Sequence, residues 1–287
     1  MYAKSLDNLY KKDRFLGQGN SKVYKGRRLS DNLPVVLKMS SSDNLPVVLK
    51  MSDSQRMLLR EHSILSMLNP NCDIKSISCI IDMGYLQGIF TIVMEYIDNA
   101  FTLTLYSLPE DIIKLLSICY DIAVAIKYLH DKGVAHRDIK PDNILIKSDN
   151  AILIDFDKSC LTTDTASDLQ SSLNCKTFVG TPYFMAPELL NADLRDEILI
   201  DPTLWLMCDI YSLGSVFYYI FSRKRNPYNA YDIDRLYQLK LNKEPTPIHS
   251  GNGDVDDLVT SMMNKNIFHR PSIDVVIGRL STLIKII

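Results

Sequence analysis

The stretch Val-Ala-His-Arg-Asp-Ile-Lys-Pro-Asp-Asn at residues 134–143 decides the fold, together with the two apolar runs that follow it. Residues 144–147 and 151–154 both read as short strands, and the turn residues Ser-Asp-Asn at 148–150 separate them. The pattern predicts a β-hairpin centred near Asp149.

The open end of this hairpin would gather polar side chains. Asn143 lies six residues before Asp149 and Asp155 lies six residues after it, so we expect the two side chains to meet there. A carboxylate beside an amide oxygen suits Mg²⁺, a hard cation that prefers oxygen ligands. Asp138 and Lys140 come a few residues earlier and add a base and a cation. This combination indicates phosphoryl transfer.

The motif at 136–143, His-Arg-Asp-Ile-Lys-Pro-Asp-Asn, resembles the catalytic loop of eukaryotic-type protein kinases, and the resemblance covers nearly the whole chain in the family's order. It implies that Asp138 orients the substrate hydroxyl and accepts its proton, and that Lys140 steadies the γ-phosphate of ATP. It also implies that Asn143 and Asp155 hold Mg²⁺. A lysine two residues after the aspartate is the pattern of serine/threonine kinases.

The distribution of strand and helix patterns agrees with that family. Strand-like runs fill the first part, interrupted by a helical pattern at 54–68, and helical patterns dominate from Glu110 onward. The resemblance implies an α+β, two-lobed protein-kinase-like fold within one kinase domain over 1–287. Its small β-rich N-lobe would span 1–96 and its larger, mainly helical C-lobe 97–287.

Residues 16–24 resemble the glycine-rich loop of the family, in which Gly17, Gly19 and Val23 would contact the nucleotide. Glycine lets the backbone approach phosphates closely. The loop is one residue short of the family pattern, and Ser21 stands roughly where the third glycine would be. We therefore expect an altered grip on the phosphates.

An eleven-residue segment, Ser-Asp-Asn-Leu-Pro-Val-Val-Leu-Lys-Met-Ser, occurs twice, at 30–40 and 42–52. Only one copy can fill the strand that carries the ATP-site lysine of the family, so Lys38 and Lys50 are both candidates. Glu61 lies within the apolar stripe of its helix, where a carboxylate needs a partner, and the resemblance pairs it with that lysine. Lys38 has the family's usual spacing from the glycine-rich loop. We favour Lys50, which keeps the link to Glu61 short and places the extra residues in a turn, where insertions are cheap.

The segment Asp155-Phe156-Asp157 resembles the metal-binding motif of the family, but aspartate replaces its glycine. Asp157 would add a negative charge beside the metal and restrict the backbone. The resemblance further implies that Met94 is the gatekeeper and that Glu95, Ile97 and Leu145 contact the adenine.

Residues 180–188, Gly-Thr-Pro-Tyr-Phe-Met-Ala-Pro-Glu, resemble the end of an activation segment. By that resemblance Thr181 supports Asp138 and Lys140, and Glu188 pairs with Arg270. Asp209, on one face of a helical pattern, would bind backbone amides of the catalytic loop.

Thr177 lies where an activating phosphate usually lands in the family, placed there by an upstream kinase or by autophosphorylation. Such a phosphate would pair with Arg137.

The amino-acid composition limits which binding partners and which cellular location we expect. The net charge is −2 and 46% of residues are hydrophobic, which argues against an electrostatic nucleic-acid or membrane-surface binder. The six cysteines form no CxxC pair, and we expect free thiols in a reducing compartment. The polar first residues predict no signal peptide, and the apolar runs are too short to predict a membrane span. The expected location is the cytoplasm, with access to the nucleus open.

The resulting prediction is a serine/threonine protein kinase with ATP and Mg²⁺ as cofactors and proteins as substrates. The alternative is a pseudokinase that binds nucleotide and serves as a scaffold, a reading supported by Asp157, the short glycine-rich loop and the duplicated strand. A third reading is a small-molecule phosphotransferase. Residues 186–188 and Arg270 argue against it, because in the family they build a platform for protein substrates.

Overall fold

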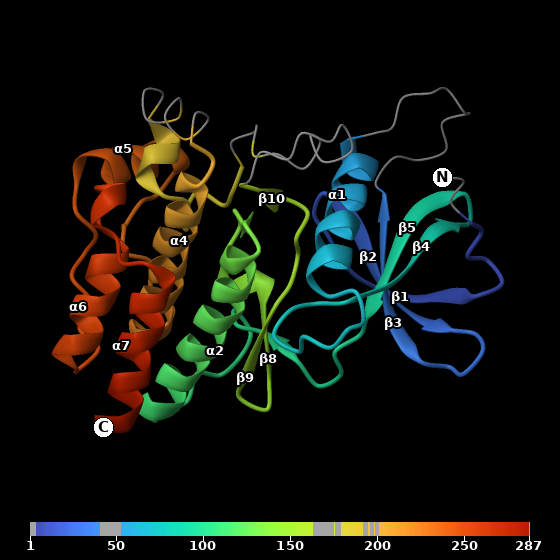
Figure 1. Ribbon diagram of the computed structural model, residues 1–287, viewed down its shortest axis with the longest axis horizontal. Coiled ribbons are helices and arrows are strands. Elements are labelled where there is room, and N and C mark those ends of the chain that lie inside the picture. Colours follow the sequence, from blue (N-terminus) through green and yellow to red (C-terminus); the bar gives the residue numbers. More distant parts are fainter. Residues whose placement is uncertain are drawn as a thin grey trace. The chain divides into compact units, whose positions relative to one another are not determined.

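The computed structural model describes residues 4–40, 53–162, 175, 179–191, 195, 198 and 201–286 (Figure 1). The chain divides into two compact units, Met1–Asn99 with Asp155–Asp157 (unit 1) and Ala100–Ile154 with Lys158–Ile287 (unit 2). The expected boundary after residue 96 therefore falls a few residues early, and a short later segment joins the first unit.

Unit 1 is built on a five-stranded antiparallel sheet of order β1-β2-β3-β5-β4 (Figure 1). The strands are β1 (Tyr10–Gln18), β2 (Ser21–Arg28), β3 (Pro34–Ser40), β4 (Ile80–Leu86) and β5 (Ile89–Glu95). Side chains alternate across β3, so Val35, Leu37 and Met39 enter the core of the sheet while Lys38 faces the other side. Helix α1 (Asp53–Leu68) contacts β3, β4 and β5.

The first copy of the duplicated segment forms β3. Its start is set by a tight turn after β2, in which the Arg28 amide donates to the Leu33 carbonyl and the Arg28 guanidinium binds Asp31. Because antiparallel neighbours can be joined by so short a turn, the copy nearest to β2 takes the strand position. The second copy, at 42–52, lies outside the described residues.

Unit 2 is mainly helical, with α2 (Ile112–Asp131), α4 (Leu204–Phe221), α5 (Ile233–Asn242), α6 (Gly253–Met262) and α7 (Ile273–Ile286). Its strands are β6 (Phe101–Thr102), β7 (Val134–Ala135), β8 (Ile144–Lys147), β9 (Asn150–Leu153) and β10 (Cys160–Leu161), and 3₁₀ turns occur at Pro141–Asn143, Pro187–Leu190 and Ile267–His269. Helix α2 lies beside α7, and α4 contacts α6 (Figure 1). The two-lobed α+β class predicted from the sequence is confirmed.

Helix α4 forms the core of unit 2. It is the one helix among the described residues that is long and apolar enough to cross a membrane by length and composition, whereas the sequence analysis expected every apolar run to be too short for that. The structure buries 83% of it, as expected for the central helix of a packed domain. Trp205, Tyr211 and Phe217 are fully buried on it.

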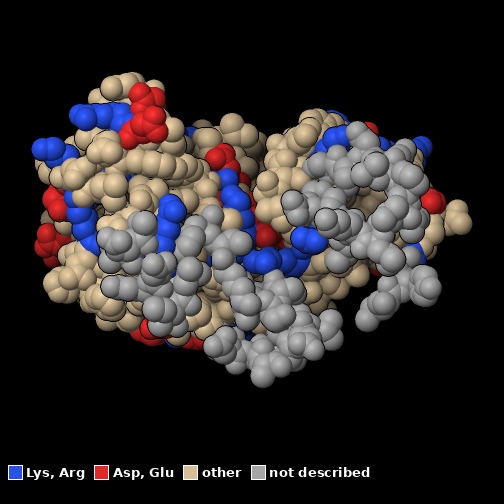
Figure 2. Space-filling model, turned by 90° about the horizontal axis from the view of Figure 1, so that it is seen from above, with Lys and Arg blue, Asp and Glu red and all other residues tan. Residues whose placement is uncertain are grey.

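Charged side chains of both signs occur on the surface of the described residues. On the face shown in Figure 2, Lys and Arg side chains lie interspersed with Asp and Glu side chains. This mixture agrees with the small net charge of −2. A mixed surface of this kind favours solubility over long-range attraction to one sign of charge.

The hairpin predicted around Asp149 is present, but its register differs by one residue. Lys147 pairs with Asn150, and the two residues between them, Ser148 and Asp149, both have positive φ (48° and 66°), as a two-residue hairpin turn requires. Asn143 therefore lies opposite Ile154, whose amide donates to the Asn143 carbonyl at 2.9 Å, rather than opposite Asp155.

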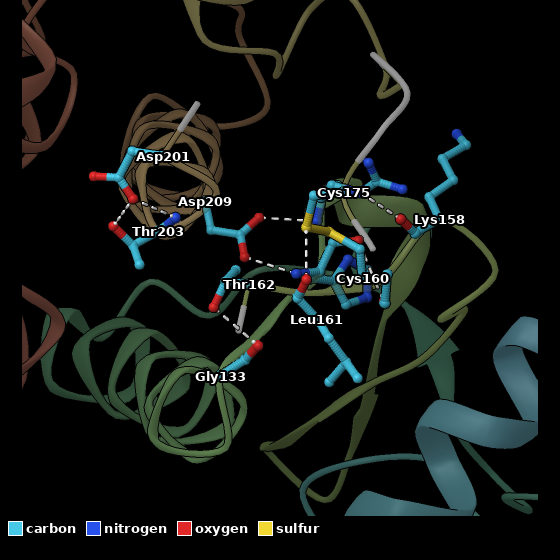
Figure 3. The surroundings of a disulfide bond; sticks show 12 residues. Gly133, Lys158, Cys160, Leu161, Thr162, Cys175, Asp201, Thr203 and Asp209 are labelled. Carbon is cyan, nitrogen blue, oxygen red and sulfur yellow. Dashed lines mark hydrogen bonds between the residues drawn. A yellow bond between two sulfur atoms is a disulfide. The ribbon is translucent and has the colours of Figure 1, made fainter. Parts of the chain in front are cut away.

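The expectation of six free thiols is wrong for four cysteines. Cys72 and Cys79 form one disulfide and Cys160 and Cys175 another, while Cys119 and Cys208 are free and buried. The Cα–Cα distances of 5.3 and 5.2 Å lie within the range that a disulfide spans. Figure 3 shows the second bridge, where Cys160 belongs to β10, the strand that pairs with β7 just before the catalytic-loop motif. These disulfides mean that free thiols no longer support the expectation of a reducing compartment.

Candidate active site

In unit 1, Lys38 makes the ion pair that the sequence left open between two lysines. Its Nζ lies 2.6 Å from Glu61 Oε2 and 2.6 Å from Asp155 Oδ1. Lys38 is 8% exposed and Glu61 is fully buried. The preference for Lys50 is therefore wrong as the partner of Glu61, because β3 is filled by the first copy; Lys50 itself lies outside the described residues.

Burial and opposite charge act against each other in this pair. Burial alone would lower the pKa of Lys38, but the attraction of Glu61 and Asp155 outweighs it, so the net shift is upward and the ammonium stays charged. Burial raises the pKa of Glu61 to about 7, although Lys38 opposes that rise. The cluster carries one lysine against several carboxylates, since Asp157 adds a further negative charge near both groups.

Asp157, the residue in place of the family's glycine, contacts the glycine-rich loop. The Asn20 amide nitrogen donates to Asp157 Oδ2 at 2.9 Å, and Asp157 is only 5% exposed. The backbone cost that we expected at this position is absent, because the left-handed φ in the segment (67°) belongs to Asp155 and not to Asp157. The amide of Phe156 donates to Glu61 Oε1 at 3.2 Å, which ties the segment to α1.

The glycines of the β1–β2 hairpin, Gly17 near the end of β1 and Gly19 in the turn, are not required by the packing of unit 1. A Cβ placed on Gly17 or Gly19 would have no atom of the described residues within 4 Å. Open space above the backbone on this loop is what a closely approaching phosphate needs. Ser21 fills the position of the third glycine and is buried at the start of β2.

The other expected nucleotide contacts are divided between the units. Met94 and Glu95 end β5, with Met94 buried and paired with Val36 of β3, and Ile97 follows them in unit 1. Val23 lies in β2 as the Cα partner of Lys38. Leu145 lies in β8 of unit 2.

In unit 2, Asp138 is held by a set of cations and donors. Its Oδ2 lies 2.8 Å from Lys158 Nζ and 3.1 Å from Lys140 Nζ, and its Oδ1 accepts from Thr181 Oγ1 at 2.7 Å. Lys140 also donates to Thr181 Oγ1 at 3.1 Å. Thr181 therefore bridges the aspartate and the lysine, as the resemblance implied.

The pKa of Asp138 is lowered to about 2. Burial alone would raise it, but Lys158, the Thr181 hydroxyl and Lys140 together outweigh burial. Lys158 was missed in the sequence analysis. The sequence offered one indication of its role: Lys158 directly follows Asp157 and so places a positive charge next to a negative one.

The backbone around Asp138 is fixed by Asp209 of α4. Its two carboxylate oxygens accept from the amides of His136 (2.7 Å) and Arg137 (2.9 Å), which confirms the predicted role of Asp209. Arg137 has a left-handed φ of 65°, a conformation that needs such support. Its guanidinium lies 5.0 Å from the Trp205 ring and donates through Nε to the Lys158 carbonyl at 2.6 Å. Thr177, the expected phosphorylation site, lies outside the described residues.

Glu188 and Arg270 form the expected buried ion pair with two parallel hydrogen bonds of 2.6 and 2.7 Å. A planar guanidinium matches a carboxylate in this geometry. Lys240 of α5, which sequence reasoning missed, donates to the Met185 carbonyl at 2.6 Å and is fully buried. Burial lowers its pKa to about 7. Since Lys240 lies in an ordinary amphipathic helix pattern, nothing in the sequence separated it from a surface lysine.

The two expected metal ligands offer oxygen atoms of the kind Mg²⁺ prefers. The amide nitrogen of Asn143 donates to the Asp138 carbonyl at 2.9 Å and to the Asp138 carboxylate at 3.2 Å. The side-chain oxygen of Asn143 is therefore the atom that could bind a metal ion. Asp155 is a carboxylate whose side chain is 32% exposed. The donor chemistry fits, although no cluster of three or more His, Cys, Asp or Glu that could hold a metal occurs in the described part of the chain.

Comparison with known proteins agrees with this arrangement. The family model described as the protein kinase domain matches residues 10–279. The chain belongs to the protein kinase family.

The curated relatives of this kinase are serine/threonine-protein kinases. A putative serine/threonine-protein kinase of Acanthamoeba polyphaga mimivirus is 33% identical over 78% of this chain and 78% of its own length. Testis-specific serine/threonine-protein kinase 1 of Homo sapiens is 34% identical over 78% of this chain and 59% of its own. Serine/threonine-protein kinase ULK1 of Homo sapiens is 27% identical over 88% of this chain but only 24% of its own. The predicted enzyme class, a serine/threonine protein kinase, is confirmed at the level of family and relatives.

Proposed function

We propose that this kinase transfers the γ-phosphate of ATP to serine or threonine hydroxyls of proteins, with Asp138 orienting the hydroxyl and taking its proton. The observation that carries the proposal is the Asp138 carboxylate held by Lys140, Lys158 and Thr181. A carboxylate with a pKa of about 2 is a weak base, so it cannot remove the proton early. Phosphoryl transfer needs mainly positioning and charge stabilisation, and a late proton acceptor suits such a reaction.

Lys140 and Lys158 supply positive charge next to that carboxylate. In a reaction that moves a phosphoryl group, these ammonium groups can stabilise negative charge on the transferred oxygens. Lys38, kept protonated by Glu61 and Asp155, is our candidate for the ATP-site lysine, with Gly17 and Gly19 as the backbone near the phosphates.

Mg²⁺, assigned by the family resemblance to Asn143 and Asp155, would neutralise phosphate charge when bound. We keep that assignment as part of the proposal. The Glu188–Arg270 pair that anchors the segment after Thr181 favours a protein substrate over a metabolite.

The test is phosphate transfer from labelled ATP with Mg²⁺ to a generic protein substrate. Asp138→Asn should lower the rate by about 10²–10⁴-fold, the usual contribution of a positioned acid–base group. Asp142→Asn is the matched control, because Asp142 is an exposed carboxylate in the same loop that accepts a hydrogen bond from Thr104. Equal rates for Asp138→Asn and the wild type would refute the proposed role.

The alternative function, a nucleotide-binding scaffold, is favoured by one feature. Asp157 is buried and bonded to the glycine-rich loop, where it adds negative charge near Asp155. ATP binding without transfer, for the wild type and for Asp157→Gly alike, would support the scaffold.

Phosphorylation at Thr177 remains our proposal for activation. Arg137, the residue expected to pair with that phosphate, contacts Trp205 and the Lys158 carbonyl in this structure. Mass spectrometry of the protein after incubation with ATP, for the wild type and for Asp138→Asn, would separate autophosphorylation from the action of an upstream kinase.

A further inference from the structure

Unit 2 carries an open groove with a volume of about 740 Å³ that the proposed chemistry does not use. Three segments line it: Tyr183 from the stretch after Thr181, the end of α4 with the turn that follows it, and residues 246–249 after α5. We call it the basic groove because Arg223, Lys224, Arg225 and His249 line it, and none of the described residues that line it is Asp or Glu.

Two of these cations are held in place by the protein. Arg223 donates to the Pro109 carbonyl at 2.7 Å and to Glu110 at 3.1 Å, and Glu110 is 95% exposed, so water weakens that pair. Lys224 donates to the Thr104 carbonyl at 2.7 Å and forms no salt bridge with a carboxylate of the described residues. Besides Glu110, one more carboxylate acts on a lining residue: burial raises the pKa of Tyr228, and Glu244, which lies 3.9 Å from Lys265, adds to that rise.

Arg225 is exposed, and its charge reaches into the groove. Burial raises the pKa of Tyr218, and Arg225 opposes that rise, which places the guanidinium close to this lining tyrosine. The Arg225 backbone is fixed as well, because its amide donates to Ser222 Oγ and its carbonyl accepts from the same hydroxyl, both at 3.2 Å. A fixed turn presents a basic side chain at low entropic cost.

The groove begins next to the proposed catalytic residues. Tyr183 comes two residues after Thr181, which is bonded to Asp138 at 2.7 Å. Phe184 packs edge-on against Tyr219 of α4 with ring centroids 6.4 Å apart, which holds this segment against the wall of the groove. An extended peptide advances by roughly 3.3 Å per residue, so a substrate with its hydroxyl at Asp138 can place a neighbouring side chain there.

We propose that the basic groove binds an anionic side chain, a carboxylate or a phosphate, of the protein substrate, with Arg225 as its main partner. The inference rests on the proposed protein kinase function and names the substrate class that the kinase prefers. Guanidinium groups match carboxylates and phosphates through paired hydrogen bonds, which makes Arg225 the residue best suited to bind such a group.

The experiment uses the full chain and a set of serine peptides with Asp, phosphoserine, Ala or Lys placed at each position in turn around the serine. We expect kcat/KM to be about tenfold higher for an anionic residue than for alanine at one or two positions, as one charge-assisted pair provides. Asp and phosphoserine peptides distinguish the two sources of charge. Arg225→Glu should remove that preference and favour the Lys peptide, while Lys132→Glu, an exposed charge reversal outside the groove, should keep it.

Peptide binding, measured by fluorescence anisotropy without ATP, separates this inference from the proposed function. If peptides are phosphorylated with no preference for an anion, or if Arg225→Glu keeps the preference, the groove inference is wrong and the kinase function stands. If no peptide is phosphorylated but the anionic peptide binds and Arg225→Glu abolishes binding, the groove stands and the proposed function fails. Thermal unfolding of both variants identifies a folding defect, and Arg225→Gln then replaces the reversal.

Discussion

Each unit contains one central ionised side chain surrounded by groups of opposite charge, and the signs are reversed between the two units. In unit 1 a single buried cation, Lys38, lies among the carboxylates Glu61 and Asp155, with Asp157 nearby. In unit 2 a single carboxylate, Asp138, lies between the ammonium groups of Lys140 and Lys158. In each case the surplus of opposite charge keeps the central group ionised against the effect of burial. The cluster around Lys38 therefore carries surplus negative charge, and the cluster around Asp138 carries surplus positive charge.

The largest effect should come from removing the central cation of unit 1. Lys38→Met leaves Glu61 and Asp155 without their shared partner, and breaking a buried pair from one side costs about 3–5 kcal/mol. We expect ATP binding to be lost and the free energy of unfolding, measured in urea, to fall.

Lys50→Met is the matched control, because Lys50 occupies the same place in the second copy of the same eleven residues. It should leave ATP binding unchanged. Equal losses for the two variants would show that the copies exchange places in the strand. Lys38 would then no longer be the single buried cation of unit 1.

A smaller effect is expected from removing one of the two cations of unit 2. Lys158→Met leaves Asp138 with Lys140 and Thr181, so the Asp138 pKa should rise from about 2 toward 3.8. Because the folded-state pKa is depressed, the ionised carboxylate contributes stability above about pH 4 that is lost as pH falls toward 2, about 2 kcal/mol for a group that is largely buried. The variant should lose less stability between pH 5 and pH 3, since its smaller pKa shift contributes less to begin with.

Urea unfolding across that pH range, with Lys147→Met as an exposed control on β8, measures this difference. At neutral pH we expect phosphate transfer by Lys158→Met to fall about tenfold, equivalent to about 1.4 kcal/mol. A faster rate would instead make Lys158 an inhibitory contact on Asp138.

The smallest effect concerns the contact between the two departures from the family pattern. A double-mutant cycle with Asn20→Ala and Asp157→Gly should give a coupling of about 0.5–1.5 kcal/mol in the apparent affinity for ATP, the usual net value of one hydrogen bond. Additive effects of the two changes would show that the short loop and Asp157 are independent features.

Most of the site in unit 2 could be predicted from the sequence. Asp138, Thr181, Asp209 and the Glu188–Arg270 pair have the contacts expected of them, because each lies in a motif whose spacing already encodes its neighbours. The predicted hairpin also formed, with a register one residue away from the expected one. A two-residue turn and a three-residue turn read alike in Ser-Asp-Asn, and only the pairing of Lys147 with Asn150 distinguishes them.

Contacts between segments far apart in the chain were not predictable in the same way. Asn20 with Asp157, Lys158 with Asp138 and Lys240 with Met185 each join residues that no motif relates. The disulfide between Cys160 and Cys175 belongs to the same class, since their spacing matches no known pattern and only the folded backbone brings them to 5.2 Å.

By itself, the sequence determined that this protein is a kinase and which residue types stand in its catalytic loop, because those features reside in short, local motifs. Only the tertiary structure decided which lysine meets Glu61. The two copies at 30–40 and 42–52 are identical and have the same local preferences, so nothing within either one can favour it. The choice depends on pairing with β2 and β5, which the first copy reaches through a short turn. Because Lys38 and Glu61 are both buried, solvent and salt screen their ion pair much less than they screen a pair on the surface.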